Sequence, residues 1–158
     1  MCGVKLRKLI LLLSYAWPLR DYHIVKIVNK IVRKVETTMT RRVFIVFDLG
    51  CGDGITAFRI VSKSVLKKYN VYLIGLDIDE KKLRKAKHVM DDVVLGDALN
   101  LPFRSKAFDI TFMIEVLDHL PKRGGRLLLK KLDSLTRCGV ILTCPQGAIP
   151  NFKSEPCV

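Results

Sequence analysis

A glycine-rich bend followed at a distance by a carboxylate is the feature of this sequence best suited to chemistry. Gly50, Gly52 and Gly54 lie directly after an apolar segment and directly before a helix-compatible one. Glycines let the backbone turn sharply and let a ligand approach it, and the helix that follows presents unpaired N–H groups. Asp77 lies 23 residues beyond Gly54, close to the roughly 20-residue spacing at which a carboxylate can bind ribose hydroxyls. The two features together predict a crevice for a nucleoside ligand.

A dinucleotide fits this bend poorly. Counted from Gly50 and Gly52, the third glycine of the dinucleotide fingerprint would fall where the bulky Ile55 stands. Asp48 and Asp53 flank the bend with negative charge. Carboxylates suit a ligand that carries an ammonium or sulfonium group better than one that carries two phosphates.

Strands and helices alternate from residue 43 onward, and this alternation predicts the scaffold that positions the bend. Helical patterns cover residues 55–69, 79–87 and 122–135. Between them lie apolar segments typical of strands buried in a parallel sheet. These segments are Val43–Phe47, Val71–Leu76, Val93–Leu95, Phe108–Ile114 and Val140–Thr143. We therefore predict an α/β fold with a doubly wound, mostly parallel, Rossmann-like sheet.

The first 42 residues differ in composition from the rest of the chain. They hold ten basic and two acidic side chains, which is +8 of the formal net charge of +13. Apolar spacing predicts two helices, one ending at Trp17–Pro18 and one over residues 24–35. Their basic residues are either merely solvated or face RNA, a membrane surface or another anionic partner. We divide the chain into a basic N-terminal helical segment (1–42), a ligand-binding α/β domain (43–145) and an irregular tail (146–158).

The last predicted strand leaves an open sheet edge. Only residues 144–158 follow it, and three of them are proline. Because an uncovered apolar edge strand pairs readily with other chains, we expect something to cover it. The candidates are the N-terminal segment, the tail, a second copy or partner subunit, or chain absent from this sequence.

Five cysteines form no C-x-x-C pair and no Cys/His ligand cluster. Their odd number favours reduced thiols in a cytoplasmic protein over a disulfide framework, and we expect no metal site. The longest fully apolar run, Leu9–Leu13, is far shorter than the ~20 residues of a transmembrane helix.

Residues 43–145 resemble the class I S-adenosylmethionine-dependent methyltransferases, in the group of small domains that includes the ubiquinone-biosynthesis type. Four segments carry the resemblance in family order: Val46–Gly54, Gly75–Asp79, Leu95–Phe103 and Phe108–Leu120. The resemblance implies S-adenosylmethionine as cofactor and methyl transfer to an acceptor that the sequence does not identify. Because family members usually continue with a helix and an antiparallel strand pair, it also implies a core truncated after the fifth strand.

The resemblance assigns roles at the matching positions. Asp48 and the bend would lie along the methionine moiety, and Asp77 would hold the ribose hydroxyls. Ile78 would pack on adenine, Asp97 would accept from its amino group, and Glu115 would border the methyl-transfer site. The implied cofactor-binding residues are Asp48, Gly50, Cys51, Gly52, Gly54, Asp77, Ile78, Asp97, Ala98 and Glu115.

Several of these residues have simpler alternative roles. Asp77 could cap a helix, although Asp79 can equally do so, and Asp97 could be a turn aspartate. The sulfonium already activates the methyl group, so a general base is needed only for a protonated acceptor. His119 is the weak candidate for that base because its ordinary pKa is near neutrality, and packing or capping is the alternative. Cys51 is expected to fill a small-residue position.

Two other functions remain open at this point. The first is a non-catalytic S-adenosylmethionine-binding subunit that needs a partner to complete its pocket. The second is an RNA-binding or RNA-modifying protein that uses the basic N-terminal segment, whose affinity for RNA would weaken steeply with salt.

Overall fold

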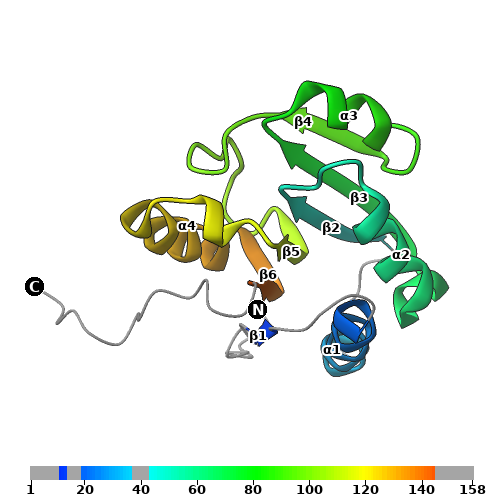
Figure 1. Cartoon of the computed structure of the whole chain (residues 1–158). Helices are drawn as coiled ribbons and strands as arrows, with labels where there is room; N and C mark the ends of the chain where they lie inside the picture. Colours follow the sequence, from blue (N-terminus) through cyan, green and yellow to red (C-terminus); the bar gives the residue numbers. More distant parts are fainter. Residues whose placement is uncertain (1–10, 14–18, 37–42, 145–158) are drawn as a thin grey trace, which may run out of the picture.

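The chain folds around one parallel β-sheet. The computed structural model describes residues 11–13, 19–36 and 43–144, and its strands lie in the order β1-β6-β5-β2-β3-β4, all parallel. They are β1 (Leu11–Leu13), β2 (Val43–Leu49), β3 (Asn70–Asp77), β4 (Asp92–Leu95), β5 (Phe108–Ile114) and β6 (Thr136–Thr143). This order confirms the predicted doubly wound α/β fold, with β2 in the centre where the winding reverses (Figure 1).

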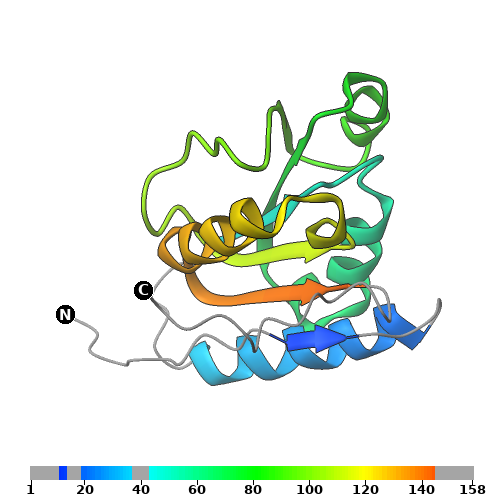
Figure 2. The same ribbon diagram turned by 60° about the vertical axis from the view of Figure 1, so that its left-hand side comes forward.

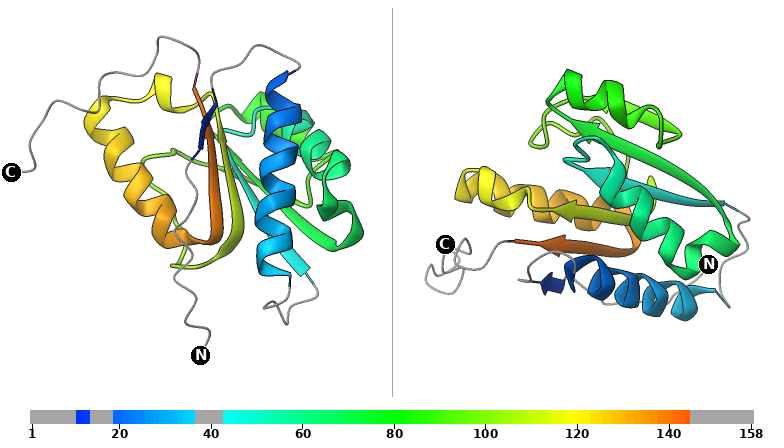
Figure 3. Two further views of the ribbon diagram at one scale, coloured as in Figure 1. Left: turned by 90° about the horizontal axis from the view of Figure 1, so that it is seen from below. Right: turned by 45° about the vertical axis from the view of Figure 1, so that its right-hand side comes forward.

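Helices cover both faces of the sheet. They are α1 (Leu19–Val35), α2 (Ile55–Lys63), α3 (Glu80–Ala86) and α4 (Lys122–Leu135), with short 3₁₀ turns η1 (Val65–Lys68) and η2 (Leu117–His119). Figure 3 shows α4 on one side of the sheet and α1 and α2 on the other. The predicted helix over 55–69 is divided at Ser64, because the Ser64 hydroxyl accepts a hydrogen bond from the N–H of Leu66 at 3.3 Å and starts η1.

The core has two layers separated by the sheet. Side chains of α1, α2 and α3 pack on one face, and those of α4 pack on the other. On the α4 side, the rings of Phe47 and Phe108 stack with centroids 4.3 Å apart, and Phe103 packs edge-on against both. β2 and β5 are buried on both faces, as their nearly continuous apolar sequences predicted.

The open edge of the sheet is covered by the N-terminal segment. Leu11–Leu13 form β1, which runs parallel to β6 with Leu12 opposite Leu142 (Figure 2). The first predicted helix is therefore wrong over these three residues, and its remainder lies outside the described residues. A short apolar run fits either pattern, and the unpaired backbone groups of β6 favour the strand.

α1 confirms the second predicted helix and begins earlier than its apolar stripe suggested. Ile24, Val28 and Val32 are completely buried against the sheet. The helix is thus an integral part of the core layer next to α2. The tail over 146–158 lies outside the described residues. No helix in the described part of the chain is long and apolar enough to span a membrane.

Candidate functional site

The bend after β2 adopts a conformation that needs glycine. Gly50, Gly52 and Gly54 have φ angles of 73°, 57° and 81°, in the left-handed region that other residues rarely adopt. The N–H of Gly50 donates to the carbonyl of Leu76 at 2.7 Å, which fixes the bend to the end of β3. A Cβ atom at Gly50 would lie 2.3 Å from Val116 Cγ2. A Cβ atom at Gly52 would meet no heavy atom of the described residues within 4 Å, so Gly52 borders open space that a ligand can enter.

Asp77 lies beside the bend, as its spacing predicted. Its Oδ2 accepts a hydrogen bond from the N–H of Gly52 at 2.8 Å, and its Oδ1 accepts from the N–H of Asp79 at 2.9 Å. Asp79 caps α3 by accepting from the N–H of Lys81 at 2.9 Å, so Asp77 is not the helix cap. Each carboxylate oxygen of Asp77 has further acceptor capacity that ligand hydroxyls can use.

Asp48 is a buried carboxylate near the end of β2. The residue is 3% exposed. Burial raises the pKa of Asp48 to about 7, and the negative charge of Asp77 adds to this effect. A ligand that brings positive charge to this point would favour the ionised form of Asp48 and would itself be stabilised by it.

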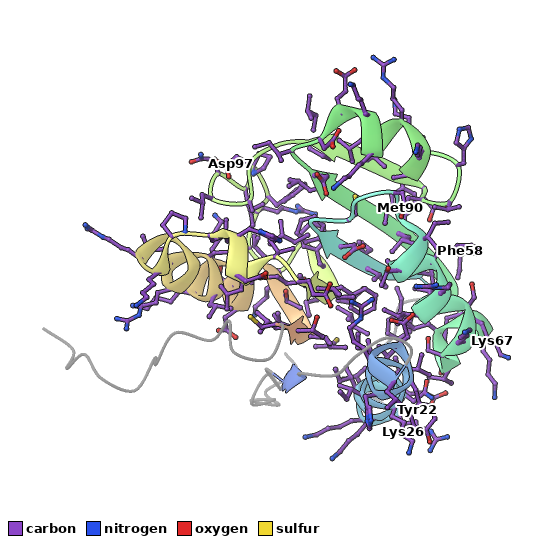
Figure 4. The ribbon with its side chains drawn as sticks, viewed as in Figure 1. Tyr22, Lys26, Phe58, Lys67, Met90 and Asp97 are labelled. Carbon is purple, nitrogen blue, oxygen red and sulfur yellow. The ribbon has the colours of Figure 1, made fainter. Side chains whose placement is uncertain are left out.

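The ends of β3 and β4 form the rim of the site. The N–H of Gly96 donates to the carbonyl of Asp77 at 3.0 Å and joins the two strand ends. Ile78 is 76% exposed, so a large apolar side chain is available to pack against a flat ring. Asp97 accepts from the N–H of Leu99 at 2.9 Å, so it is a turn aspartate here and lies on the loop labelled in Figure 4.

Glu115 lies directly after the end of β5. It has a φ of 56°, unusual for a non-glycine residue, and its N–H donates to the carbonyl of Thr143 at 3.1 Å. Nη1 of Arg20, in the first turn of α1, donates to Glu115 Oε1 at 2.5 Å. The sequence analysis did not identify Arg20, which is 3% exposed.

The ion pair extends across the α1 side of the sheet. Arg20 Nη2 lies 3.3 Å from Asp21 Oδ1, and Arg59 Nη2 of α2 lies 3.1 Å from Asp21 Oδ2. One signal in the sequence could have revealed this network: Arg20 stands four residues before Ile24 and so continues the buried stripe of α1. A charge on a buried stripe predicts a paired or functional residue.

The remaining predicted residues play smaller parts. The His119 side chain is 76% exposed and lies 3.7 Å from an Asp118 oxygen, so it is oriented largely toward solvent. Burial, aided by Asp48 and Asp77, raises the pKa of the Cys51 thiol, which argues against a nucleophile. Ala98 is partly buried against the α4 layer of the core.

The fold and site together define a class of protein: a Rossmann-like domain whose residues at the carboxyl ends of β2 and β3 suit an adenosyl ligand. The open space at Gly52, the carboxylate of Asp77 and the exposed Ile78 suit a nucleoside. The buried Asp48 suits a cationic group on the same ligand. These residues fit S-adenosylmethionine, which carries a sulfonium and an ammonium group.

Comparison with known proteins extends this result. A family model described as a methyltransferase domain matches residues 46–139, more than half of the chain. A 27-O-demethylrifamycin SV methyltransferase of Amycolatopsis mediterranei is 33% identical over 103 residues, which cover 52% of this chain and 36% of that protein. A tRNA (carboxymethyluridine(34)-5-O)-methyltransferase of Arabidopsis thaliana is 29% identical over 93 residues, which cover 59% of this chain and 20% of that protein.

A solved structure shows the same fold. The PH0226 protein of Pyrococcus horikoshii OT3 superimposes with a TM-score of 0.53 at 22% identity, over 74% of this chain and 56% of that one. The chain therefore belongs to the methyltransferase-domain family of class I S-adenosylmethionine-dependent methyltransferases, whose cofactor is S-adenosylmethionine. It spans well under half the length of the two curated relatives.

Proposed function

We propose that this chain binds S-adenosylmethionine at the carboxyl ends of β2, β3 and β4 and transfers its methyl group to an acceptor. The observation that carries the proposal is the hydrogen bond from Gly52 to Asp77 beside the buried Asp48. This hydrogen bond joins the glycine bend to Asp77, the two features that the sequence analysis paired by their spacing.

Each residue of the site makes a different contribution to cofactor binding. The bend exposes its backbone to the ligand at Gly52, and Asp77 accepts hydrogen bonds from the ribose hydroxyls. Asp48 complements the positive charge of the ligand, and Ile78 packs on its base. The cofactor supplies an activated methyl group, so the chain's contribution is alignment and exclusion of water, with Glu115 on the acceptor side.

Isothermal titration calorimetry with S-adenosylmethionine and S-adenosylhomocysteine tests the binding step. We expect both to bind the full chain and Asp77→Ala to lose binding, because the ribose hydroxyls lose their acceptor. Asp92→Ala removes the same charge from the exposed start of β4 and serves as the control. Absence of binding by the folded full chain would refute the proposal.

The acceptor is not defined by the family. Of the two curated relatives, one is named for a rifamycin and the other for a tRNA, so related domains act on very different molecules. An assay of methyl transfer from radiolabelled S-adenosylmethionine separates an enzyme from a non-catalytic subunit. Turnover by a monomer, measured together with light scattering, would exclude a requirement for a partner subunit or a second copy.

We also propose that residues 43–145 together with α1 form the cofactor domain and that the protein is cytoplasmic. The contacts of α1 with the sheet support a domain that extends back to the start of that helix. Free thiols at Cys51, Cys138 and Cys144 support a reducing compartment.

A further inference from the structure

A strongly basic surface lies on the outer side of α1 and η1. Exposed lysine and arginine side chains of these elements and of the end of α2 form it, and an exposed acidic side chain, Glu36, follows α1 directly. We call it the α1–η1 surface and define it by Lys26, Lys30, Arg33, Lys34, Lys63, Lys67 and Lys68. Figure 4 shows Lys26 and Lys67 on the same lower part of the molecule, well away from Asp97.

Two hydrogen bonds hold the two halves of this surface together. The N–H of Val65 donates to Asn29 Oδ1 at 2.6 Å, and the hydroxyl of Tyr69 donates to the carboxylate of Glu36. η1 therefore lies alongside the second half of α1. Because each bond joins a different end of η1 to α1, the basic side chains of both elements occupy fixed relative positions.

The pairing of charges also distinguishes this surface from α3. In the part of the chain that the structure describes, none of the seven basic side chains forms an ion pair. α3 differs, because Arg84 pairs with Glu80 at 2.8 Å. Uncompensated lysine and arginine side chains bind phosphate chains by releasing the counterions of the nucleic acid.

A shallow, open depression lies in the α1 part of this surface. It has a volume of about 530 Å³ and is lined by Lys26, Asn29, Lys30, Arg33 and Lys34. A row of cations can follow a phosphate backbone.

An exposed aromatic ring lies at the end of this surface nearest the methyl-transfer site. Tyr22 is 54% exposed, and Lys26 Nζ lies 4.4 Å from its ring centroid. Tyr22 lies two residues after Arg20, whose side chain contacts Glu115. From Tyr22 to Lys34 the helix extends about 18 Å, so the basic residues extend along α1 away from the end of the helix that holds Arg20.

The packing of α1 argues against a membrane as the partner. A helix that lies in a membrane interface needs a free apolar face, and basic residues alone bind lipid weakly. The apolar face of α1, including Ile24, Val28 and Val32, is completely buried in the core. A stacking ring beside cations is instead typical of surfaces that bind single strands.

We propose that the α1–η1 surface binds single-stranded RNA and directs it past Tyr22 toward Glu115, so that RNA is the methyl acceptor. RNA is the nucleic acid that commonly presents unstacked, single-stranded bases. The assignment of RNA as acceptor rests on the proposed methyltransferase function, whereas RNA binding by this surface does not.

Fluorescence anisotropy with a labelled, unstructured RNA of about 20 nucleotides tests the binding. We expect affinity to fall steeply with salt, and the double variant Lys30→Gln, Arg33→Gln to reduce the slope of log affinity against log salt by about 1.4. The matched control is Lys82→Gln, Lys85→Gln on α3, which lowers the net charge equally, from +13 to +11. An equal loss in both variants, or salt-insensitive binding, would overturn the proposal.

Tyr22→Ala tests the stacking ring. We expect at least about a fivefold loss of RNA affinity, with Tyr22→Phe retaining it. Tighter binding to anionic phosphatidylserine vesicles or to DNA of the same sequence would also count against RNA. The same protein samples are titrated with S-adenosylmethionine. If the parent protein does not bind the cofactor, the function proposed above is refuted. If the parent binds the cofactor but not RNA, the RNA assignment alone is refuted.

Discussion

At the scale of single residues, two carboxylates with different environments define the site. Asp77 accepts two backbone hydrogen bonds at the end of β3. Asp48 is buried on the neighbouring strand, and its pKa is raised. One carboxylate is therefore held by the backbone of the bend, and the other is an unfavourable buried charge that a cationic ligand would relieve.

The raised pKa of Asp48 predicts a dependence of stability on pH. Unfolded Asp48 ionises near 3.8, whereas folded Asp48 ionises at about 7, so between these values the folded state holds a proton that the unfolded state has lost. The contribution of Asp48 to the free energy of unfolding therefore falls as pH rises from 4 to 7. Asp48→Asn should remove this fall and unfold at higher urea than the parent at pH 8, with a gain of up to about 4 kcal/mol.

Urea titrations at pH 5 and pH 8 measure this effect, with Asp92→Asn as the exposed control. If parent and Asp48→Asn lose the same stability between the two pH values, the buried charge is not its source. The variant should also bind S-adenosylmethionine more weakly at pH 8, because it lacks the negative charge.

The glycines of the bend predict two separable effects. Gly50→Ala combines a positive φ with a contact to Val116 at 2.3 Å, and we expect a loss of at least about 2 kcal/mol of stability. Gly52→Ala has only the positive φ and should cost about 1 kcal/mol, yet it places a methyl group in the ligand's space. Thermal unfolding measures the stability of the two variants, and calorimetry measures their affinity for the cofactor. A Gly52→Ala variant that binds the cofactor as tightly as the parent would contradict this placement of the ligand.

At the scale of elements, α1 joins the core to the acceptor side of the site. Its apolar stripe packs on the sheet, and Arg20 at its start holds Glu115 at the end of β5. The position of Glu115, in a left-handed conformation, is thus coupled to the docking of a helix that precedes β2 to β6 in the chain.

Arg20→Ala should weaken this coupling. We expect a loss of about 1–3 kcal/mol of stability, because a charged hydrogen bond to the half-exposed Glu115 carboxylate is removed. Lys82→Ala, at an exposed position of α3, should cost under about 0.5 kcal/mol. We also expect Arg20→Ala to lower the rate of methyl transfer with little change in cofactor affinity, and Arg20→Lys to restore part of the rate. Denaturant unfolding and turnover assays check both points, and equal behaviour of the two alanine variants would contradict the role of Arg20.

At the scale of the whole molecule, β1 completes the sheet. Among the described residues, β1 is the first strand along the chain, and it pairs with β6, the last. Without it, the backbone of β6 would present unpaired N–H and carbonyl groups on a strand whose residues are almost all buried.

Deletion of residues 1–13 should therefore cause concentration-dependent self-association. Size-exclusion chromatography with light scattering measures it, and deletion of residues 146–158 controls for shortening the chain by the same length. A truncated protein that stays at the parent's mass over a wide concentration range would show that the edge of β6 needs no cover.

The sequence by itself determined the sheet, the bend and Asp77. Period-two and period-3.6 patterns, turn glycines and the strand–bend–helix order are local properties, and parallel strands bring their carboxyl ends to one edge of a sheet. Only the tertiary structure decided that Leu11–Leu13 form a strand and that Arg20 reaches Glu115, across 95 positions of the chain. Both depend on which distant backbone or side chain offers a partner, and spacing along the chain carries no information about such partners.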